Sequence, residues 1–503
     1  MLLLLFTPTA GFHPSGSQIR TSLQNPNIAG RDRCGIRLLA SASQATKMTD
    51  AFSVLDAGLT EGESLWRPAP YYSSCRVTWR QTHPQLYRDI LRLSNAELQQ
   101  LYESSHTLHE WMCERIPSFE PVAKISQWLD EHAASMRERR RCHATERVKA
   151  ASWRVPGKKA EEVEAFAAMM PKRRQPAVEW CSGKGYLSQR LLAHGVVSSS
   201  VCLDVDAALC DAGREIARSA QLPMRFEEVD VLKPHLLPSN IHSMSPPVTH
   251  VALHACGGLH REMLRCVVSK LKAAQVAVAP CCYHRYPREE MLKPLSKIAS
   301  RSRLRLAHAD LKLATSGQCA VHKRKGRVFQ KERVWRKAFA AWHCRALRRQ
   351  AMRGNLKTIR SVMSNCMKGR RIDWTQASRL PSIPNKLLAP ASEPHTSLAA
   401  FEAFCRWGAT VVSDSEPPRK LLLPALEEWN EREASLCLQI GEKQIERVAR
   451  LDLVRFAYRR PLEQWLVLDL CFFLEEHGYD VDLVQLCEQT ISPRNLLVLG
   501  HRQ

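Results

Sequence analysis

The stretch AVEWCSGKGYL, residues 177–187, decides the fold. An apolar run of strand length ends in a turn that contains Gly183 and Gly185, and a helical pattern begins at Tyr186. Glycine in such a turn lets the backbone approach a ligand closely, and the N-terminus of the following helix offers unpaired N–H groups. A Gly-X-Gly turn is common in α/β proteins, so its meaning depends on the surrounding sequence.

That surrounding sequence alternates short apolar runs with helical patterns. The strand-like segments are AVEWC (177–181), SSVCLDV (199–205), MRFEEVDV (224–231), VTHVALHAC (248–256) and AQVAVAP (274–280). The helical segments between them are 186–195, 207–220 and 259–274. This alternation predicts parallel strands joined by right-handed crossovers, hence a doubly wound, Rossmann-like α/β sheet. Ligands in such a sheet bind at the carboxyl ends of the strands.

The C-terminus supplies further elements of the same kind. Residues 462–478 predict a helix that ends at Gly478, and 479–486 and 492–500 predict two strands. We therefore expect the chain to leave the sheet after its fifth strand, build a helical insertion, and return to complete the sheet.

Five regions are expected along the chain. They are a leader (1–47), an N-terminal helical domain (48–150), the sheet-forming core (151–290), a basic helical insertion (291–455) and a C-terminal helix with a strand pair (456–503). In the N-terminal domain, Leu98, Leu101, Leu108 and Trp111 follow helical spacing behind a cap at Ser94. A Pro-rich loop is expected at 379–394.

Residues 1–47 have a different composition from the rest. They contain one acid, Asp32, several arginines and many small polar residues. This fits an organelle transit peptide; equally, Met48 is the true start and the preceding residues are not part of the protein. In both cases we expect these residues to be disordered and exclude them from the fold.

The composition of the chain indicates the cellular compartment and the kind of binding partner. The chain has 18 cysteines, scattered without Cys-X-X-Cys pairs, which favours reduced thiols in a cytoplasmic environment. No run of residues is long and apolar enough for a membrane span. The formal net charge of +23 indicates attraction to polyanions, and RNA is the expected partner; a generic solvated basic surface is the alternative.

The basic residues gather in one segment. Between His322 and Arg371 there are 17 Lys/Arg residues and one acid, Glu332, with Trp335, Phe339 and Trp342 interleaved. Such a pattern is typical of a groove that follows a phosphate backbone. We expect the three aromatic residues to be the buried stripe of an amphipathic helix, and the charged face to be the RNA-binding candidate.

The acids near the glycine turn predict the cofactor. Asp204 ends the second strand, where it can accept hydrogen bonds from ribose hydroxyls. The turn lacks a complete Gly-X-Gly-X-X-Gly, and Lys184 and Tyr186 crowd the place of a pyrophosphate. S-adenosylmethionine therefore fits better than NAD, with Glu179 indirectly at its amino end and Asp230 at its adenine edge. A simple strand-end role for Asp230 stays open.

Four segments carry a family resemblance: EWCSGKGYLSQRL (179–191), ALHACGGLH (252–260), APCCYH (279–284) and SPRNLLVLG (492–500). Together they resemble class I S-adenosylmethionine-dependent methyltransferases of the methyltransferase-like type with a PCCYH block. A more distant similarity is to tRNA ribose 2'-O-methyltransferases, whose N-terminal zinc-finger cysteines this chain lacks. The resemblance implies a seven-strand sheet with a final antiparallel hairpin, and cofactor contacts at Glu179, Gly183, Gly185, Asp204 and Asp230.

The resemblance also brings two cysteine-rich turns to one edge of the sheet. Methyl transfer requires alignment of the acceptor and, where the acceptor carries a proton, a base. A histidine that titrates near neutrality suits that task, so His284 is the first candidate base and His254 the second. Tyr283 is expected to stack on a planar acceptor. A structural role for either histidine remains the alternative.

The cysteines admit a second interpretation, as metal ligands. Cys256, Cys281 and Cys282 are soft ligands, but adjacent cysteines do not easily occupy two corners of one tetrahedral zinc site. We therefore expect no metal, and treat the three cysteines as small walls of the substrate pocket. A disulfide between neighbouring cysteines is strained and disfavoured in a reducing compartment.

The sequence thus predicts an S-adenosylmethionine-dependent methyltransferase acting on a macromolecule, RNA (rRNA or tRNA) in the first place. The alternatives are a protein methyltransferase acting on a basic or ribosomal protein, and a non-catalytic RNA-binding protein that keeps the fold. The expected location is cytoplasmic, or an organelle if residues 1–47 are a transit peptide.

Overall fold

The computed structural model describes most of the 503 residues. Those outside the description are 1–43, 72–76, 142–156, 234, 236, 243, 245–246, 272, 286–291, 316–322, 353–396, 414–428, 490 and 503. The leader, the Pro-rich loop and much of the basic segment 322–371 therefore lie largely outside the described residues. The chain divides into two units, Met1–Lys47 and Met48–Gln503. The finer region boundaries stay a prediction.

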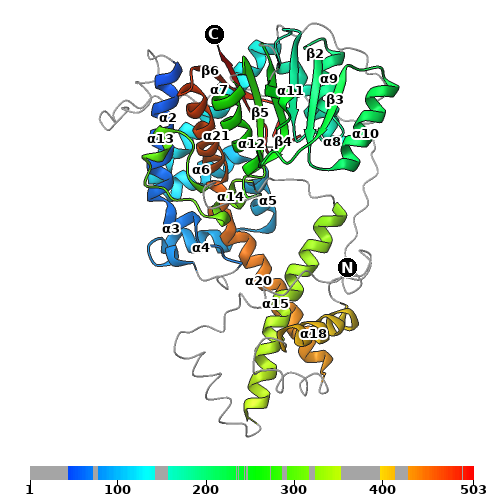
Figure 1. The fold of residues 1–503 in the computed structure, drawn as a ribbon. Coiled ribbons are helices and arrows are strands. Elements are labelled where there is room, and N and C mark those ends of the chain that lie inside the picture. The colour runs from blue at the N-terminus through cyan, green and yellow to red at the C-terminus, as the bar shows by residue number, and fades with distance from the viewer. Residues whose placement is uncertain are drawn as a thin grey trace, which may run out of the picture. The chain divides into compact units, whose positions relative to one another are not determined.

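A seven-stranded sheet forms the centre of the second unit (Figure 1). Its strands are β1 (Gln175–Trp180), β2 (Val197–Asp204), β3 (Met224–Glu228), β4 (Thr249–Cys256), β5 (Gln275–Cys281), β6 (Tyr479–Gln485) and β7 (Leu496–Arg502). Their order is β3-β2-β1-β4-β5-β7-β6, with β1 to β5 parallel and β7 antiparallel to both of its neighbours. This confirms the predicted Rossmann-like α/β fold, including its completion by the C-terminal hairpin.

The central strands form where the sequence is apolar on both faces, whereas β3 and β6 carry exposed acidic residues. Every residue of β5 is buried, as a central parallel strand requires. β3 ends at Glu228, earlier than predicted, and the chain turns at Asp230, whose Oδ1 accepts a hydrogen bond from the Leu232 amide at 3.1 Å.

Helices surround the sheet. Helices α8 and α9 share one apolar core with the central strands, α10 packs on β2 and β3, and α12 and α21 pack on β4 and on β6 and β7. The helices with these roles are α8 (Gly157–Met169), α9 (Tyr186–Ala193), α10 (Ala207–Ser219), α12 (Gly258–Cys266) and α21 (Arg459–Glu475). The connections also contain α11 (Ser239–His242) and the π-helical turn Val267–Leu271.

The N-terminal region is helical, as expected, but one predicted helix is two. Ser94 begins α5 with a capping box, and Ser104 ends α5 and caps α6 by accepting from the Thr107 amide at 3.1 Å. A serine there offers the backbone a partner outside the helix, which favours a break. The elements are α2 (Gln44–Glu61), α3 (Glu63–Trp66), η1 (Thr78–Arg80), α4 (Pro84–Arg92), α5 (Asn95–Glu103), α6 (Ser105–Arg115), η2 (Pro117–Phe119) and α7 (Glu120–Arg141).

Of the four apolar residues predicted to line that helix, three are buried. Trp111 is only half-buried, and the Arg115 guanidinium lies 4.0 Å from its ring centroid. A cation over the ring face covers an indole that the core does not.

The excursion after β5 is built from helices α13 (Lys297–Ser300), α14 (His308–Ala314), α15 (Lys323–Met352), α18 (Leu398–Ser413) and α20 (Glu431–Ala457). Trp335, Phe339 and Trp342 of α15 are at most 1% exposed, which confirms the buried stripe. Gly441 of α20 permits close packing, since a Cβ there would lie 2.7 Å from the Val334 carbonyl oxygen. Among the helices described, none is both long and apolar enough to cross a membrane.

Candidate functional site

Backbone strain is concentrated at one edge of the sheet. Cys181 after β1, His254 in β4 and Cys282 after β5 adopt positive φ angles of 56°, 68° and 43°. They are three of the five non-glycine residues with positive φ in the described chain, and all lie toward the carboxyl ends of parallel strands. Each such residue costs about 1–3 kcal/mol and persists where surrounding structure enforces it, commonly at functional sites.

The turn after β1 is held from behind by Glu179. This carboxylate is 4% exposed and its Oε2 accepts a hydrogen bond from the Ser188 amide in the first turn of α9 at 2.8 Å. Burial raises the pKa of Glu179 to about 7. Gly185 precedes α9 with φ +70°, and a Cβ there would lie 2.7 Å from Met224 Cε. Glu179 and Gly185 therefore shape the turn from inside the fold.

The front of the same turn is open. Gly183 has φ +57° and no atom within 4 Å of where its Cβ would be. Its amide donates a hydrogen bond to Asp204 Oδ2 at 2.7 Å, while Asp204 Oδ1 accepts from the Asp206 amide at 3.1 Å. Asp204 is half-buried, so its carboxylate also faces solvent beside the open glycine.

Asp230 lies near the same place. The charges of Asp204, Cys256 and Asp230 all act on the Cys181 thiol and, after burial, contribute to raising its pKa. The ends of β1 to β4 thus converge around Cys181. A glycine with empty space in front of it and two carboxylates beside it can hold a nucleoside. Asp230 also pairs with Lys233 at 3.3 Å.

The turns after β4 and β5 are joined through their backbones. The Gly257 amide donates to the Cys281 carbonyl at 2.9 Å, and the Gly258 amide to the Arg285 carbonyl at 3.2 Å. A Cβ on Gly257 would lie 1.9 Å from the Arg285 carbonyl oxygen, so only glycine fits. The two cysteine-rich motifs therefore meet at one edge, as expected.

Three sulfur atoms gather where these turns meet. Cys256 Sγ lies 3.8 Å from Cys281 Sγ, which lies 3.4 Å from Cys282 Sγ. Hydrogen bonds from Cys256 and Cys281, then the charge of Arg494, lower the pKa of Cys282; Arg494 Nη1 is 3.5 Å from that sulfur. Cys282 has φ +43°, and its side chain lies on the same side as that of Cys281 although the two residues are adjacent.

His284 follows directly, and its hydrogen bonds define its tautomer. Its Nδ1 lies 3.1 Å from Thr315 Oγ1, and that hydroxyl donates its one hydrogen to the Lys312 carbonyl at 2.9 Å. Thr315 can therefore only accept from the imidazole, so Nδ1 carries the proton and Nε2 has a lone pair. Burial lowers the pKa of His284, which keeps the ring neutral. These are the properties of a general base.

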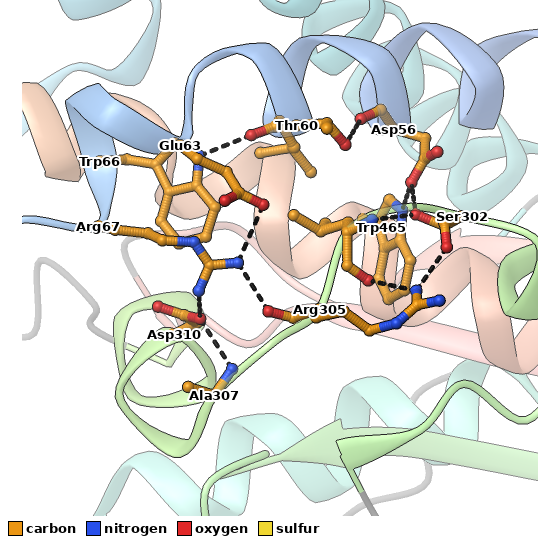
Figure 2. A network of polar contacts seen from close by, with 12 residues as sticks. Asp56, Thr60, Glu63, Trp66, Arg67, Ser302, Arg305, Ala307, Asp310 and Trp465 are labelled. Carbon is orange, nitrogen blue, oxygen red and sulfur yellow. Dashed lines mark hydrogen bonds and ion pairs between the residues drawn. The ribbon is translucent and has the colours of Figure 1, made fainter.

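The segment that carries Thr315 is itself anchored. His308 Nε2 lies 2.8 Å from the His284 carbonyl oxygen. Figure 2 shows the contacts that hold this segment: Arg67 bridges Asp310 at 2.6 Å and the Arg305 carbonyl at 2.7 Å. Asp56 accepts hydrogen bonds from Ser302 and from Trp465 (Figure 2). Helices α2, α3 and α21 thus fix the chain on which the His284 contacts depend.

A comparison with known protein families finds one match. Residues 158–289 match the family model of a methyltransferase domain. No curated protein and no solved structure gives a significant match. The matched stretch contains β1 to β5 and the two cysteine-rich turns, and it supports methyl transfer as the general reaction of this domain.

The second candidate base, His254, has a carboxylate partner. Its Nε2 lies 2.9 Å from Glu162 Oε2, whose side chain is 7% exposed, and the ring is 36% exposed. His254 is therefore held against α8, with Nε2 engaged by Glu162.

The expectation for Tyr283 needs correction. Its side chain is 7% exposed, and its ring meets the ring of His260 edge-on at 5.8 Å between centroids. The turn after β5 directs this tyrosine into the fold, against His260 of α12. It is not presented for stacking on an acceptor.

Several residues that contact the candidate site were not predicted from the sequence. Thr315 lies 31 positions from His284, Glu162 precedes the sheet, and Arg494 sits in the final loop. Arg494 alone had a signal, since it belongs to the SPRN stretch that carries the family resemblance.

Proposed function

We propose that this protein is an S-adenosylmethionine-dependent methyltransferase whose acceptor is a macromolecule, RNA in the first place. The observation that carries the proposal is the hydrogen bond of His284 Nδ1 to Thr315, which leaves the lone pair on Nε2, on the edge that also presents the open Gly183 turn. When bound, the cofactor supplies an electrophilic methyl group on a cationic sulfur. His284 would accept the proton that the acceptor loses.

The cofactor is assigned to the turns after β1, β2 and β3. Gly183 gives the backbone room to approach the ligand, Asp204 would bind the ribose hydroxyls, and Asp230 the adenine edge. Glu179 and Gly185 would act indirectly by keeping the turn and α9 in place. Cys256, Cys281 and Cys282 would line the acceptor side.

The RNA acceptor is supported by the net charge of +23 and by the basic segment 322–371. In the described part of α15, however, several cations have partners within the chain. Arg336 pairs with Glu332 at 2.6 Å, Lys337 donates to the Tyr71 carbonyl at 2.5 Å and Arg345 pairs with Glu433 at 2.9 Å. The RNA proposal therefore rests on the net charge and on the number of Lys and Arg residues in this segment of the sequence.

The cofactor claim is tested by calorimetry of the full chain with S-adenosylmethionine. The acceptor claim is tested by incubating protein, labelled cofactor and cell extract, followed by RNase or protease digestion. We expect binding, label that RNase removes, and about 100-fold slower transfer by His284→Ala with cofactor affinity unchanged. RNA affinity should fall steeply with salt. RNA binding without cofactor binding would instead identify a non-catalytic RNA-binding protein.

A basic protein is the alternative acceptor, and one cavity favours it. A space of about 530 Å³ lies between α6, α7 and the β6–β7 loop, and its lining includes Glu110, Glu120, Asp130 and Glu131. Glu120 is paired with Lys124, which also lines the cavity, at 2.5 Å, and Asp130 with Arg460 at 2.6 Å. Glu110 and Glu131 add negative charge that attracts cationic side chains. Label that protease removes and RNase leaves would establish this alternative.

A cytoplasmic location remains part of the proposal, with an organelle as the alternative. Fluorescent fusions of the full chain and of residues 48–503 distinguish the two. The same diffuse distribution for both supports the cytoplasm, and organelle import of the full chain alone supports a transit peptide.

A further inference from the structure

We propose that Cys256, Cys281 and Cys282 form a binding site for a thiophilic d10 metal ion, zinc in the simplest case. Their three sulfur atoms lie within 4.8 Å of one another. Thiolates are preferred ligands of such ions, and three of them, with a fourth position open, match the ligand count of zinc sites that act on a substrate.

Two separate irregularities of the backbone bring the sulfurs together. Successive residues of a strand point to opposite faces, so Cys281 and Cys282 should diverge. The φ of +43° at Cys282 reverses this. In β4, the register with β5 shifts between Leu253 and Cys256, and His254 has φ +68°. Both distortions lie at the turns that carry the three sulfur atoms.

The sulfur distances suit a bound ion. With zinc–sulfur bonds of about 2.3 Å at tetrahedral angles, neighbouring thiolates lie about 3.8 Å apart. The separations found are 3.8 Å between Cys256 and Cys281 and 3.4 Å between Cys281 and Cys282. The third pair, Cys256 and Cys282, lies within 4.8 Å, so side-chain adjustments of at most about 1 Å would complete the site.

The surroundings supply charge balance and access. Three thiolates and one divalent ion leave one negative charge, and Arg494 Nη1 lies 3.5 Å from Cys282 Sγ, where it can donate to a ligating sulfur. Cys281 is buried, while Cys256 and Cys282 are half-buried, so an ion has a path to the site. Within the described residues, no fourth histidine, cysteine or acid joins the group.

The open position determines what the ion would do. The three cysteines belong to the edge that the proposed function assigns to the acceptor, and there the ion would bind a nitrogen, oxygen or sulfur atom of the acceptor and lower its pKa. This role rests on the proposed function. Metal binding itself does not.

Cobalt(II) titration of the reduced, metal-free full-length protein tests the site. Cobalt in a thiolate site gives sulfur-to-metal charge-transfer absorption and visible bands, which zinc should then abolish by displacement. We expect one equivalent to bind, with at least 100-fold weaker binding in Cys256→Ser and in Cys282→Ser. Cys113→Ser is the matched control, a half-buried cysteine outside the group, and should leave the titration unchanged.

Alkylation read by mass spectrometry tests the same site without a variant. Zinc should protect Cys256 and Cys282 from iodoacetamide and leave Cys113 reactive. The proposal is overturned by a wild type that shows no thiolate bands, by bands that survive in both serine variants, or by zinc-independent alkylation. None of these readouts uses S-adenosylmethionine or an acceptor, so failure of the proposed methyl transfer is a separate result.

Discussion

The two halves of the sheet edge are built in different ways. The β1–β3 half, made by the turns after β1, β2 and β3, uses backbone amides and carboxylates around an open glycine, with one strained residue, Cys181 at φ +56°. The β4–β5 half, made by the turns after β4 and β5 with the β6–β7 loop, uses strained residues, three thiols and an imidazole. Gly183 has empty space before it, whereas Gly257 touches the Arg285 carbonyl. The β1–β3 half therefore leaves space for a ligand, and the β4–β5 half is held together by close backbone contacts.

The comparison of the two halves shows how backbone strain orients side chains at this edge. In the β1–β3 half, ordinary turn chemistry places Asp204 at the end of its strand. In the β4–β5 half, positive φ angles at His254 and Cys282 and the bulge in β4 direct side chains that regular strands would point elsewhere. Such geometry costs free energy that close backbone contacts must offset.

Substitution of Gly257 and of Gly183 should give the largest difference in stability between the two halves. Gly257→Ala places a methyl group 1.9 Å from the Arg285 carbonyl oxygen at φ +54°, so we expect the free energy of unfolding to fall by about 3 kcal/mol or more. Gly183→Ala, at φ +57° with open space, should cost only about 1 kcal/mol. Urea unfolding followed by circular dichroism measures both.

Gly183→Ala should in turn reduce S-adenosylmethionine affinity, because its methyl group occupies the assigned cofactor space. Equal destabilisation by the two substitutions would contradict the distinction between a half held by close backbone contacts and a half that leaves space for a ligand.

Substitution of Asp204 and of Asp206, two neighbouring carboxylates, tests the cofactor site of the β1–β3 half, with smaller expected effects. Asp204→Ala should weaken S-adenosylmethionine binding by about 10- to 100-fold, the value of one or two hydrogen bonds to a charged group. Asp206 caps α10 by accepting from the Leu209 amide at 3.2 Å. Asp206→Ala should therefore cost about 1 kcal/mol of stability and leave cofactor affinity unchanged. Calorimetry that finds both variants alike would remove Asp204 from the cofactor site.

The halves also differ in how far sequence predicts them. Gly183, Asp204 and the strand order follow from local patterns, because each residue's place depends on the strand it ends. The β4–β5 half depends on long-range partners: Thr315 at the C-terminal cap of α14, Glu162 on α8 and Arg494 in the final loop. The sequence predicted that its cysteines and histidines lie at this edge, but it did not predict how their side chains are oriented. It misplaced Tyr283 because the positive φ at Cys282 reverses the alternation of side chains along the strand.

The smallest predicted effect concerns the tautomer of His284. Thr315→Val keeps the shape of the side chain but removes the oxygen that accepts the Nδ1 proton, so the tautomer with a protonated Nε2 becomes populated. We expect methyl transfer to slow by about tenfold in kcat with KM nearly unchanged. Thr315→Ser should restore the rate, since it keeps the hydroxyl. Nitrogen-15 NMR of the imidazole reads the tautomer directly.

The pH profile supplies an independent readout of the same residue. The base must be neutral, and burial lowers the pKa of His284 below its ordinary value of 6.5. Activity should therefore rise with pH, reach half its plateau below pH 6.5, and be lost as pH falls through the lowered pKa. Thr315→Val should lower the plateau without moving that midpoint toward higher pH, because its defect lies in the tautomer and not in the charge. A midpoint above pH 6.5, or an unchanged tautomer in Thr315→Val, would show that the ring is not poised by Thr315 and would favour His254 as the base.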